Sequence, residues 1–327
     1  MVTVLGIDGG QSGSRLQLRM PDGAVVSWRD AGIPPGMTPR QAMTGPLLDS
    51  VVRKVSDAEL DRPTVVGAGL TGFHGGAADA AEVLDVWSDA LGVRRLSLTD
   101  DAVSSYLGAL GDTSGVVVAA GTGVTVLASN GAGCVRVNGW GPTLGDEGGG
   151  YWIGQEGLRS AYRWLDGRGG SERLATAARE AFGTLTELPG TLAASADRVA
   201  MIASFSRHVA AAAHDLDPEA TRIWSDAGHE LATAALAALR RLDDGGAQEP
   251  GPAAGAAQIS WNGSLFEAGE LLSGPFRQAI RAAMPDARIV GPRADALHGA
   301  LELTRRDTIT RFGALIDTAE IGRDSSC

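Results

Sequence analysis

Lysine and cysteine are nearly absent from this sequence. Lys54 is the only lysine among 327 residues, and no G-x-x-x-x-G-K-[ST] segment occurs, which excludes a P-loop nucleotide site. The two cysteines, Cys134 and Cys327, are too few and too far apart in the sequence for a disulfide framework or a cysteine-ligated metal cluster.

Long apolar runs and an excess of positive charge are also missing. No run reaches membrane-spanning length, and the N-terminus lacks the basic and apolar regions of a signal peptide, so we expect a cytoplasmic protein with no membrane partner. The net charge is −11, from 39 acidic and 28 basic side chains, which argues against nucleic acid as a partner. Any bound phosphate must therefore be neutralised locally, by backbone N–H groups or a metal ion.

Two stretches of similar design lie about a hundred residues apart. The first begins with an apolar, β-branched run at 2–8, continues into a glycine-rich turn and returns as a strand at 15–20. The second has strands at 115–119 and 124–129 around Gly121-Thr122-Gly123. A duplication of this kind predicts two similar domains that face each other, each an α/β layer with a mixed sheet.

The full set of predicted elements follows from apolar periodicity and turn residues. Strands are expected at 2–8, 15–20, 24–28, 64–68, 94–98, 115–119, 124–129, 133–137, 258–261 and 287–290. Helices are expected at 40–55, 78–91, 102–110, 151–165, 171–182, 198–213, 219–242, 270–284 and 294–305. We expect a loop at 243–257 and a frayed end over the last dozen residues.

The segment 138–155, N-G-W-G-P-T-L-G-D-E-G-G-G-Y-W-I-G-Q, is the one around which the sequence is organised. It contains seven glycines, which let the backbone fold tightly and approach a ligand at an entropic cost. A long surface loop is the simpler interpretation. Trp140 beside the acidic pair Asp146-Glu147 favours a sugar site instead, with the ring against the aromatic face and the hydroxyls on the carboxylates.

The first glycine turn, Asp8-Gly9-Gly10-Gln11-Ser12, can be a plain hairpin or an anion-binding nest. Its N–H groups can point at a phosphate, Ser12 adds a hydroxyl, and Asp8 could hold a magnesium ion (Mg2+) through water. Because Gly121-Thr122-Gly123 stands at the matching place of the second stretch, the two turns together could bind a polyphosphate from both sides.

Two aspartates, Asp100 and Asp101, stand at a junction of strand and helix. One of them can serve as an N-cap, worth about 1 kcal/mol. A pair exceeds what capping requires, and one could accept a proton from a substrate hydroxyl, contributing roughly 10²–10⁴ in rate.

The segment Gly67–Gly72 fits the dinucleotide pattern G-x-G-x-x-G after a strand. The following Phe73-His74-Gly75-Gly76 does not begin a helix, which argues against that fold. We expect these glycines to let the strand end approach a ligand. The five histidines show no metal-ligand spacing.

Taken together, these motifs resemble the N-acetylglucosamine kinase family, which is related to the activator ATPases of benzoyl-CoA reductase within the superfamily of sugar kinases, heat-shock chaperones and actin. The resemblance covers nearly the whole chain. It rests on Asp8–Ser12, Thr99–Ala102, Ala120–Gly123, Gly139–Gly154, Ser260–Phe266 and Pro292–Leu301, which occur in order and at fitting distances.

The resemblance implies two actin-like (ribonuclease-H-like) domains around a central nucleotide cleft, 1–114 with a returning 292–327 and 115–291. It implies an ATP-dependent kinase that phosphorylates an amino sugar, above all N-acetylglucosamine, at the 6-hydroxyl. ATP and Mg2+ would be the cofactors, a small-molecule sugar the partner, and a homodimer is a family expectation.

The same resemblance assigns roles to individual residues. Asp101 would be the catalytic base, facing the sugar hydroxyl. The residues expected to bind the nucleotide are Gly9, Gly10, Gln11, Ser12, Gly121, Thr122, Gly123, Gly263 and Ser264. Those expected to contact the sugar are Asp101, Gly139, Trp140, Gly141 and Asp146.

Three departures from the family pattern leave alternatives open. Gln11 replaces a usual third glycine, Val124-Thr125 stands where the animal enzymes carry Ser-Asn, and the loop 31–37 lacks their sugar-reading asparagine. A glucosamine kinase is therefore an alternative. An activator-type ATPase is another, although its cysteines would lie in the first domain, whereas Cys134 follows the second turn. A sugar sensor that lost phosphoryl transfer is a third.

Overall fold

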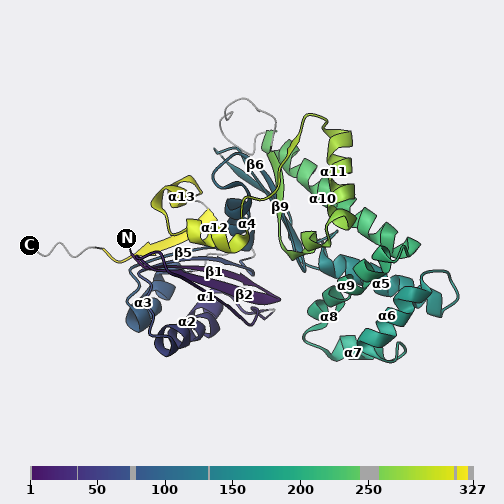
Figure 1. Cartoon of the computed structure of the whole chain (residues 1–327), viewed down its shortest axis with the longest axis horizontal. Coiled ribbons are helices and arrows are strands. Elements are labelled where there is room, and N and C mark those ends of the chain that lie inside the picture. The colour runs from purple at the N-terminus through teal and green to yellow at the C-terminus, as the bar shows by residue number, and fades with distance from the viewer. Residues whose placement is uncertain are drawn as a thin grey trace, which may run out of the picture. The chain divides into compact units, whose positions relative to one another are not determined.

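The computed structural model describes residues 2–34, 36–73, 79–131, 133–243, 258–312 and 315–322. The chain forms two compact units, Met1–Asp112 with Pro292–Cys327, and Thr113–Gly291, and each contains one sheet (Figure 1). No helix in the described ranges is both long and apolar enough to cross a membrane.

The sheet of the first unit has the order β11-β5-β4-β1-β2-β3. Its strands are β1 (Val4–Gly10), β2 (Gly13–Arg19), β3 (Val25–Asp30), β4 (Val65–Leu70), β5 (Arg95–Asp100) and β11 (Ile316–Glu320). The predicted antiparallel meander of the first three strands is confirmed, and β1, β4 and β5 run parallel to one another. The sheet is therefore mixed, as predicted.

Residues that alternate along β1 meet different layers, because successive side chains of a strand point to opposite faces. Leu5 and Ile7 belong to a core shared with α2 (Pro46–Asp57) and α3 (Ala80–Leu91). On the other face α12 (Ala296–Glu302) comes so close that a Cβ at Gly6 would lie 2.6 Å from Leu301 Cγ. Figure 1 shows α1 (Pro39–Thr44), α2 and α3 beneath the sheet and α4 (Asp101–Leu110) and α12 above it.

Two predictions for the first unit were wrong. The helix expected at 40–55 is two helices, because the chain turns at Gly45 and Pro46 begins the second. The end of the chain is not frayed throughout: α13 (Arg306–Arg311) and β11 follow α12, and β11 pairs antiparallel with β5. Thr99 Oγ1 also donates to the carbonyl of Leu315 at 2.6 Å, so tertiary contacts hold this segment.

The sheet of the second unit repeats the first, as the duplication predicts. Its order is β10-β9-β6-β7-β8. This matches β5-β4-β1-β2-β3 both in the order in which the strands follow one another along the chain and in their directions. The strands are β6 (Gly115–Ala120), β7 (Val124–Ser129), β8 (Cys134–Asn138), β9 (Gln258–Asn262) and β10 (Arg288–Ile289).

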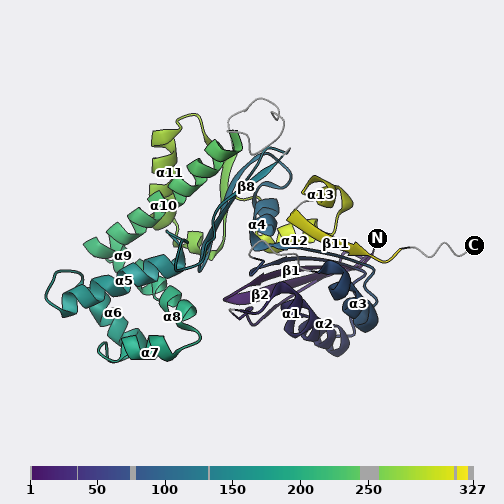
Figure 2. The same ribbon diagram turned by 180° about the vertical axis from the view of Figure 1, so that it is seen from behind.

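The remainder of the second unit is mostly helical. Its elements are α5 (Gly150–Leu165), α6 (Glu172–Phe182), α7 (Leu188–Ala194), α8 (Arg198–Ser204), α9 (Ser206–His214), α10 (Pro218–Asp243), a 3₁₀ turn at Ser264–Ala268 and α11 (Glu270–Ala283). The predicted helix at 219–242 is confirmed as α10, whose Ile223, Ala227 and Leu231 recur at helical spacing and are buried in the core with α11, which packs beside α10 (Figure 2). Helix α7 was not predicted, and the predicted helix 198–213 divides at Phe205. The predicted loop lies almost wholly outside the described residues.

Candidate active site

The first glycine turn is a tight connection between β1 and β2. Gly10 pairs with Gly13, so exposed Gln11 and Ser12 form the turn between them. Gln11 does not adopt a positive φ. A third glycine is therefore not required by the backbone here, and this departure from the family pattern is compatible with the same turn.

Packing beneath the turn explains why residue 9 is a glycine. A Cβ at Gly9 would lie 2.7 Å from Leu70 Cδ2 and 2.9 Å from Ile33 Cδ1, so a larger residue would displace both. The loop after β3 closes on the turn as well, because the N–H of Ile33 donates to the carbonyl of Gly10 at 2.9 Å. The turn is thus held in place by apolar contacts and backbone hydrogen bonds from neighbouring segments.

Asp8, the proposed magnesium residue, is held by an arginine that was not among the predicted site residues. Arg15 donates twice to Asp8 Oδ2, from Nε at 2.9 Å and from Nη2 at 2.5 Å, and its Nη1 donates to Asp295 Oδ2 at 2.7 Å. Burial raises the pKa of Asp8, although the charge of Arg15 opposes the shift. Asp8 and Arg15 face each other across the hairpin register, a pairing that the predicted meander could have revealed.

Asp101 lies at the same edge of the sheet as the first turn. Gly9 pairs with Leu70, and Leu70 pairs with Asp100, so the carboxyl ends of three parallel strands meet there. Asp100 is the N-cap of α4, since its side chain accepts the N–H of Ala102 at 2.9 Å. Asp101 is the first helical residue, and the helix is capped by Asp100.

The expectation that Gly67 and Gly69 admit a ligand was wrong. A Cβ at Gly67 would lie 2.3 Å from the carbonyl oxygen of Ala300 in α12, and one at Gly69 would lie 2.0 Å from Ser104 Oγ in α4. The lack of a side chain at Gly67 and Gly69 makes room for helices α12 and α4, respectively. Of the segment that follows them, 74–76 lies outside the described residues.

The second glycine turn is joined to the start of α5. The N–H of Gly150 donates to the carbonyl of Gly121 at 2.8 Å, and the N–H of Tyr151 donates to that of Thr122 at 2.9 Å. These bonds satisfy two of the N–H groups that a helix start leaves without helical partners. They also turn the carbonyl oxygens of Gly121 and Thr122 toward the start of α5.

Asp146 lies against this turn. A Cβ at Gly123 would be 2.4 Å from Asp146 Oδ2, which only glycine permits. Asp146 has a positive φ of 63°, and its N–H donates to Asn138 Oδ1 at 2.7 Å. Asn138 therefore holds the backbone of Asp146, although the sequence singled it out only as the start of the segment.

The carboxyl group of Asp146 is buried without being fully satisfied. The residue is 7% exposed, and its Oδ1 has no hydrogen-bond partner among the residues that the structure describes. Burial raises its pKa, against the opposing effect of the N–H groups of Val124 and Gly141. A buried acceptor without a partner is costly, and a ligand hydroxyl would satisfy it.

The remaining sugar-site residues flank this carboxylate. Gly139 and Gly141 both have positive φ, at 77° and 80°, as their glycine identity predicts. Trp140 is 74% exposed, so its ring presents a large apolar face to solvent. Glu147 is exposed, and the acidic pair thus divides into one buried and one solvated carboxylate.

The predicted adenosine-side residues lie beside the second turn. Strands β6 and β9 are parallel and pair at Ala119 and Asn262, so the segments that follow them leave the sheet at one edge. Gly263 has a φ of 102°, and a Cβ there would lie 2.2 Å from the carbonyl oxygen of Ala120. Ser264 follows, exposed, at the start of the 3₁₀ turn.

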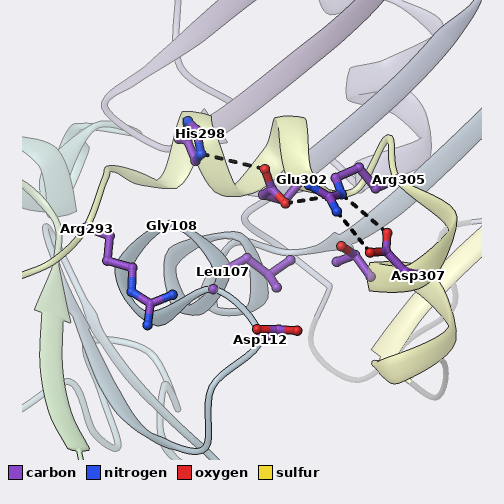
Figure 3. A pocket seen from close by; sticks show the side chains of 10 residues that line it. Leu107, Gly108, Asp112, Arg293, His298, Glu302, Arg305 and Asp307 are labelled. Carbon is purple, nitrogen blue, oxygen red and sulfur yellow. Dashed lines mark hydrogen bonds and ion pairs between the residues drawn. The ribbon is translucent and has the colours of Figure 1, made fainter.

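A cavity of about 420 Å³ in the first unit is separate from all of these residues (Figure 3). Its acidic and basic lining side chains are Asp112, Arg293, Glu302, Arg305 and Asp307, and His298 also lines it. Several of them pair with one another: Glu302 lies 3.6 Å from His298 and 3.7 Å from Arg305, which in turn reaches Asp307 at 3.0 Å. We interpret this network as structural, because it links α12 to the start of α13.

A magnesium ion fits the chemistry of Asp8. The described residues contain no group of three or more acidic, histidine or cysteine side chains that could hold a metal. Mg²⁺ usually keeps several waters and binds through one or two carboxylates and substrate phosphates, so a single carboxylate such as that of Asp8 can serve as the protein's contribution. Both bonds from Arg15 go to Oδ2 of Asp8, so Oδ1 is the oxygen that could accept a magnesium-bound water.

Comparison with known proteins gives the same fold. The model of the BadF/BadG/BcrA/BcrD ATPase family matches residues 5–303. A proposed N-acetylglucosamine kinase from Chromobacterium violaceum is 27% identical, with a TM-score of 0.71 over 93% of this chain and 99% of that protein.

Two more distant structures share the architecture. A proposed N-acetylglucosamine kinase from Porphyromonas gingivalis is 16% identical, with a TM-score of 0.67 over 93% of this chain and 98% of that one. A ROK family glucokinase from Streptomyces griseus, solved with glucose and AMPPNP, is 17% identical, with a TM-score of 0.56 over 92% and 99%. The predicted actin-like fold of two α/β domains is thereby confirmed.

Proposed function

We propose that this carbohydrate kinase, which belongs to the BadF/BadG/BcrA/BcrD ATPase family, transfers the γ-phosphate of ATP to the 6-hydroxyl of an amino sugar, N-acetylglucosamine. The observation that carries the proposal is Asp146. Its buried Oδ1 has no hydrogen-bond partner within the described part of the chain, and its other oxygen touches the second glycine turn. One residue thus adjoins both a place for a hydroxylated ligand and a place for a phosphate.

In the proposed reaction the sugar oxygen attacks the γ-phosphorus while the bond from that phosphorus to the bridging oxygen of ADP breaks. Asp101 accepts the proton that leaves the hydroxyl. Its place supports this role, because Asp100 already caps the helix and Asp101 lies at the sheet edge that carries the first glycine turn. The remaining residues position the ligands, which supplies most of the catalysis in phosphoryl transfer.

The phosphates are assigned to the two glycine turns. Gly9, Gly10, Gln11 and Ser12 would bind them from the domain 1–114 with 292–327, and Gly121–Gly123 from the domain 115–291. Gly263 and Ser264 would lie near the adenosine. A magnesium ion, held through water by Asp8, would supply charge neutralisation at the phosphates.

The identity of the sugar rests on three groups of residues. Trp140 offers an apolar face, Gly139 and Gly141 shape the backbone beside it, and Asp146 accepts hydroxyl hydrogens. Val124-Thr125 differs from the animal enzymes near this position, which makes glucosamine the alternative substrate. We further propose a cytoplasmic location, because the two cysteines are isolated from each other in the sequence. We also propose that the protein forms a homodimer.

The test is a comparison of kcat/KM for N-acetylglucosamine, glucosamine, N-acetylmannosamine and glucose at a fixed ATP concentration. A preference of tenfold or more for N-acetylglucosamine would support the proposal. Preference for glucosamine would show that the altered residues have changed the pocket. ATP hydrolysis without phosphorylation of any hexose would favour an activator-type ATPase and refute the proposal.

A further inference from the structure

A second cavity, of about 520 Å³, lies among α5, α7 and α8 of the second unit. None of the residues assigned to the nucleotide or the sugar lines it. Its volume falls within the range of small-molecule sites, about 300–1,000 Å³. We name it the arginine cavity, because Arg159, Arg163 and Arg168 line it and no acidic side chain does.

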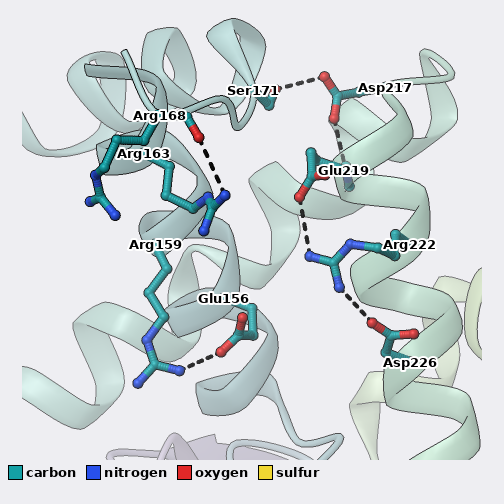
Figure 4. Close-up of polar contacts among 10 residues, drawn as sticks. Glu156, Arg159, Arg163, Arg168, Ser171, Asp217, Glu219, Arg222 and Asp226 are labelled. Atoms are coloured by element: carbon teal, nitrogen blue, oxygen red, sulfur yellow. Dashed lines mark hydrogen bonds and ion pairs between the residues drawn. The ribbon is translucent and has the colours of Figure 1, made fainter. Parts of the chain in front are cut away.

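The three arginines line the same cavity; in Figure 4 Arg163 and Arg168 lie side by side, whereas the side chain of Arg159 points toward Glu156. Arg159 and Arg163 are four residues apart on α5, a spacing at which like charges on a helix repel each other. Arg163 Nη2 donates to the carbonyl of Arg168 at 3.3 Å, which brings the third guanidinium-bearing residue to the same rim.

Neighbouring acids compensate the cluster only in part. Arg159 pairs with Glu156, and Arg168 pairs with Asp166 at 2.7 Å. Arg163 forms no ion pair with any residue that the structure describes. On α10, shown in Figure 4, Arg222 lies between Glu219 at 3.1 Å and Asp226 at 2.6 Å. Other arginines of this unit, among them Arg207 and Arg281, also form no ion pair with a described residue. What sets Arg163 apart is that it lines the cavity.

The rest of the cavity wall is apolar. Leu158 and Ile202 are each 6% exposed, and half-buried Leu192 comes from α7, a short helix in which Leu188 is the only buried residue. An apolar wall with a cationic rim matches a ligand that has one anionic end and a compact apolar body. One guanidinium group can donate two parallel hydrogen bonds to two oxygens of the same phosphate, so a phosphate suits this rim well.

We propose that the arginine cavity binds an organic phosphate monoester, with the phosphate on Arg159, Arg163 and Arg168 and the apolar body against Leu158, Leu192 and Ile202. This site is distinct from the proposed catalytic one and does not depend on it. Helix α5 connects the arginine cavity with the second glycine turn. Gln155 lines the cavity and donates to the hydroxyl of Tyr151 at 3.2 Å, and the backbone N–H of Tyr151 donates to the carbonyl of Thr122 in the turn. An occupant would contact the helix that supports the second glycine turn.

The test is calorimetric titration with phenyl phosphate, in phosphate-free buffer at low salt, with Mg²⁺ and AMPPNP in excess. We expect one site per chain, with phenol and inorganic phosphate each binding at least about tenfold more weakly. Arg163→Gln should weaken phenyl phosphate by about tenfold or more. The control is Arg207→Gln, which removes the same charge from an exposed position of α9 outside the cavity and should leave the affinity unchanged.

A second variant tests the apolar wall. Leu192→Ala should weaken phenyl phosphate while leaving inorganic phosphate unaffected, and thermal melts check that each variant folds. Equal affinities of wild type and Arg163→Gln would overturn the proposal. So would competition between phenyl phosphate and AMPPNP, because the phosphate would then occupy the nucleotide site.

Discussion

Replacing Asp146 with asparagine should separate sugar binding from folding. The substitution keeps the shape of the side chain and removes its charge. In the native protein Oδ1 is buried and no described residue forms a hydrogen bond with it, while backbone N–H groups of Val124 and Gly141 interact with the carboxylate. An asparagine can keep one acceptor for these N–H groups, but it places a donor, or a weaker neutral acceptor, where the sugar hydroxyl is expected.

The expected loss follows from the energy of one hydrogen bond to a charged group, about 1.5–3 kcal/mol. That corresponds to a rise of roughly 10- to 150-fold in the KM for the sugar, since about 1.4 kcal/mol is a factor of ten. The KM for ATP should change little. Steady-state kinetics with each substrate varied in turn measures both values.

Stability should respond in the opposite direction. Because burial raises the pKa of Asp146, its ionised form is disfavoured in the folded state, and the stability it contributes below the unfolded pKa is lost as the pH rises through the folded value. At neutral pH Asp146→Asn should therefore melt at the same temperature as the native protein or higher. As the pH falls, the KM for the sugar should rise in the native enzyme and stay flatter in the variant. An unchanged KM, or a variant that melts well below the native protein, would refute the assignment.

Further predictions concern catalysis, the turns and the metal. Asp101→Asn should keep ATP binding and lose roughly 10²–10⁴ in kcat. Asp100→Asn should lose little, because asparagine caps a helix about as well as aspartate. If a coupled assay shows the larger loss for Asp100→Asn, the base has been assigned to the wrong one of the two residues. Gly263→Ala should cost about 1–3 kcal/mol in denaturant unfolding, because its φ of 102° and the nearby Ala120 carbonyl both oppose a Cβ. Gly121→Ala is its matched control for stability, since a Cβ there meets no atom within 4 Å; a loss of stability equal to that of Gly263→Ala would contradict this reasoning. EDTA should abolish turnover and excess Mg²⁺ should restore it, and full activity in EDTA would exclude the proposed metal.

Much of the fold was predictable because its strongest signals are local. Alternating and β-branched strands with glycine turns occur twice, and the two sheets indeed share one strand order. The missed elements depend on tertiary contacts. Strand β11 has five residues and an edge position, and its pairing with β5 joins segments more than two hundred residues apart in the sequence. Helix α7 is short and carries a glycine in its third position, which weakens the helical pattern.

The candidate site was predictable in its residue types and less so in their partners. The glycines of both turns and the cap at Asp100 follow from backbone chemistry. The contact between Gly123 and Asp146 does not, because it requires 138–155 to fold back on the second turn. Gly67 and Gly69 show the converse error: glycines at a strand end can admit a packed helix as readily as a ligand, and only the packing decides which.

The most direct test of the account is to identify the product. The protein is incubated with ATP, Mg²⁺ and N-acetylglucosamine, and the mixture is followed by phosphorus NMR with Asp101→Asn in parallel. The account predicts a phosphomonoester on the 6-oxygen of the sugar, formed in step with ADP and nearly absent with the variant. Release of inorganic phosphate alone, with the sugar unchanged, would contradict it.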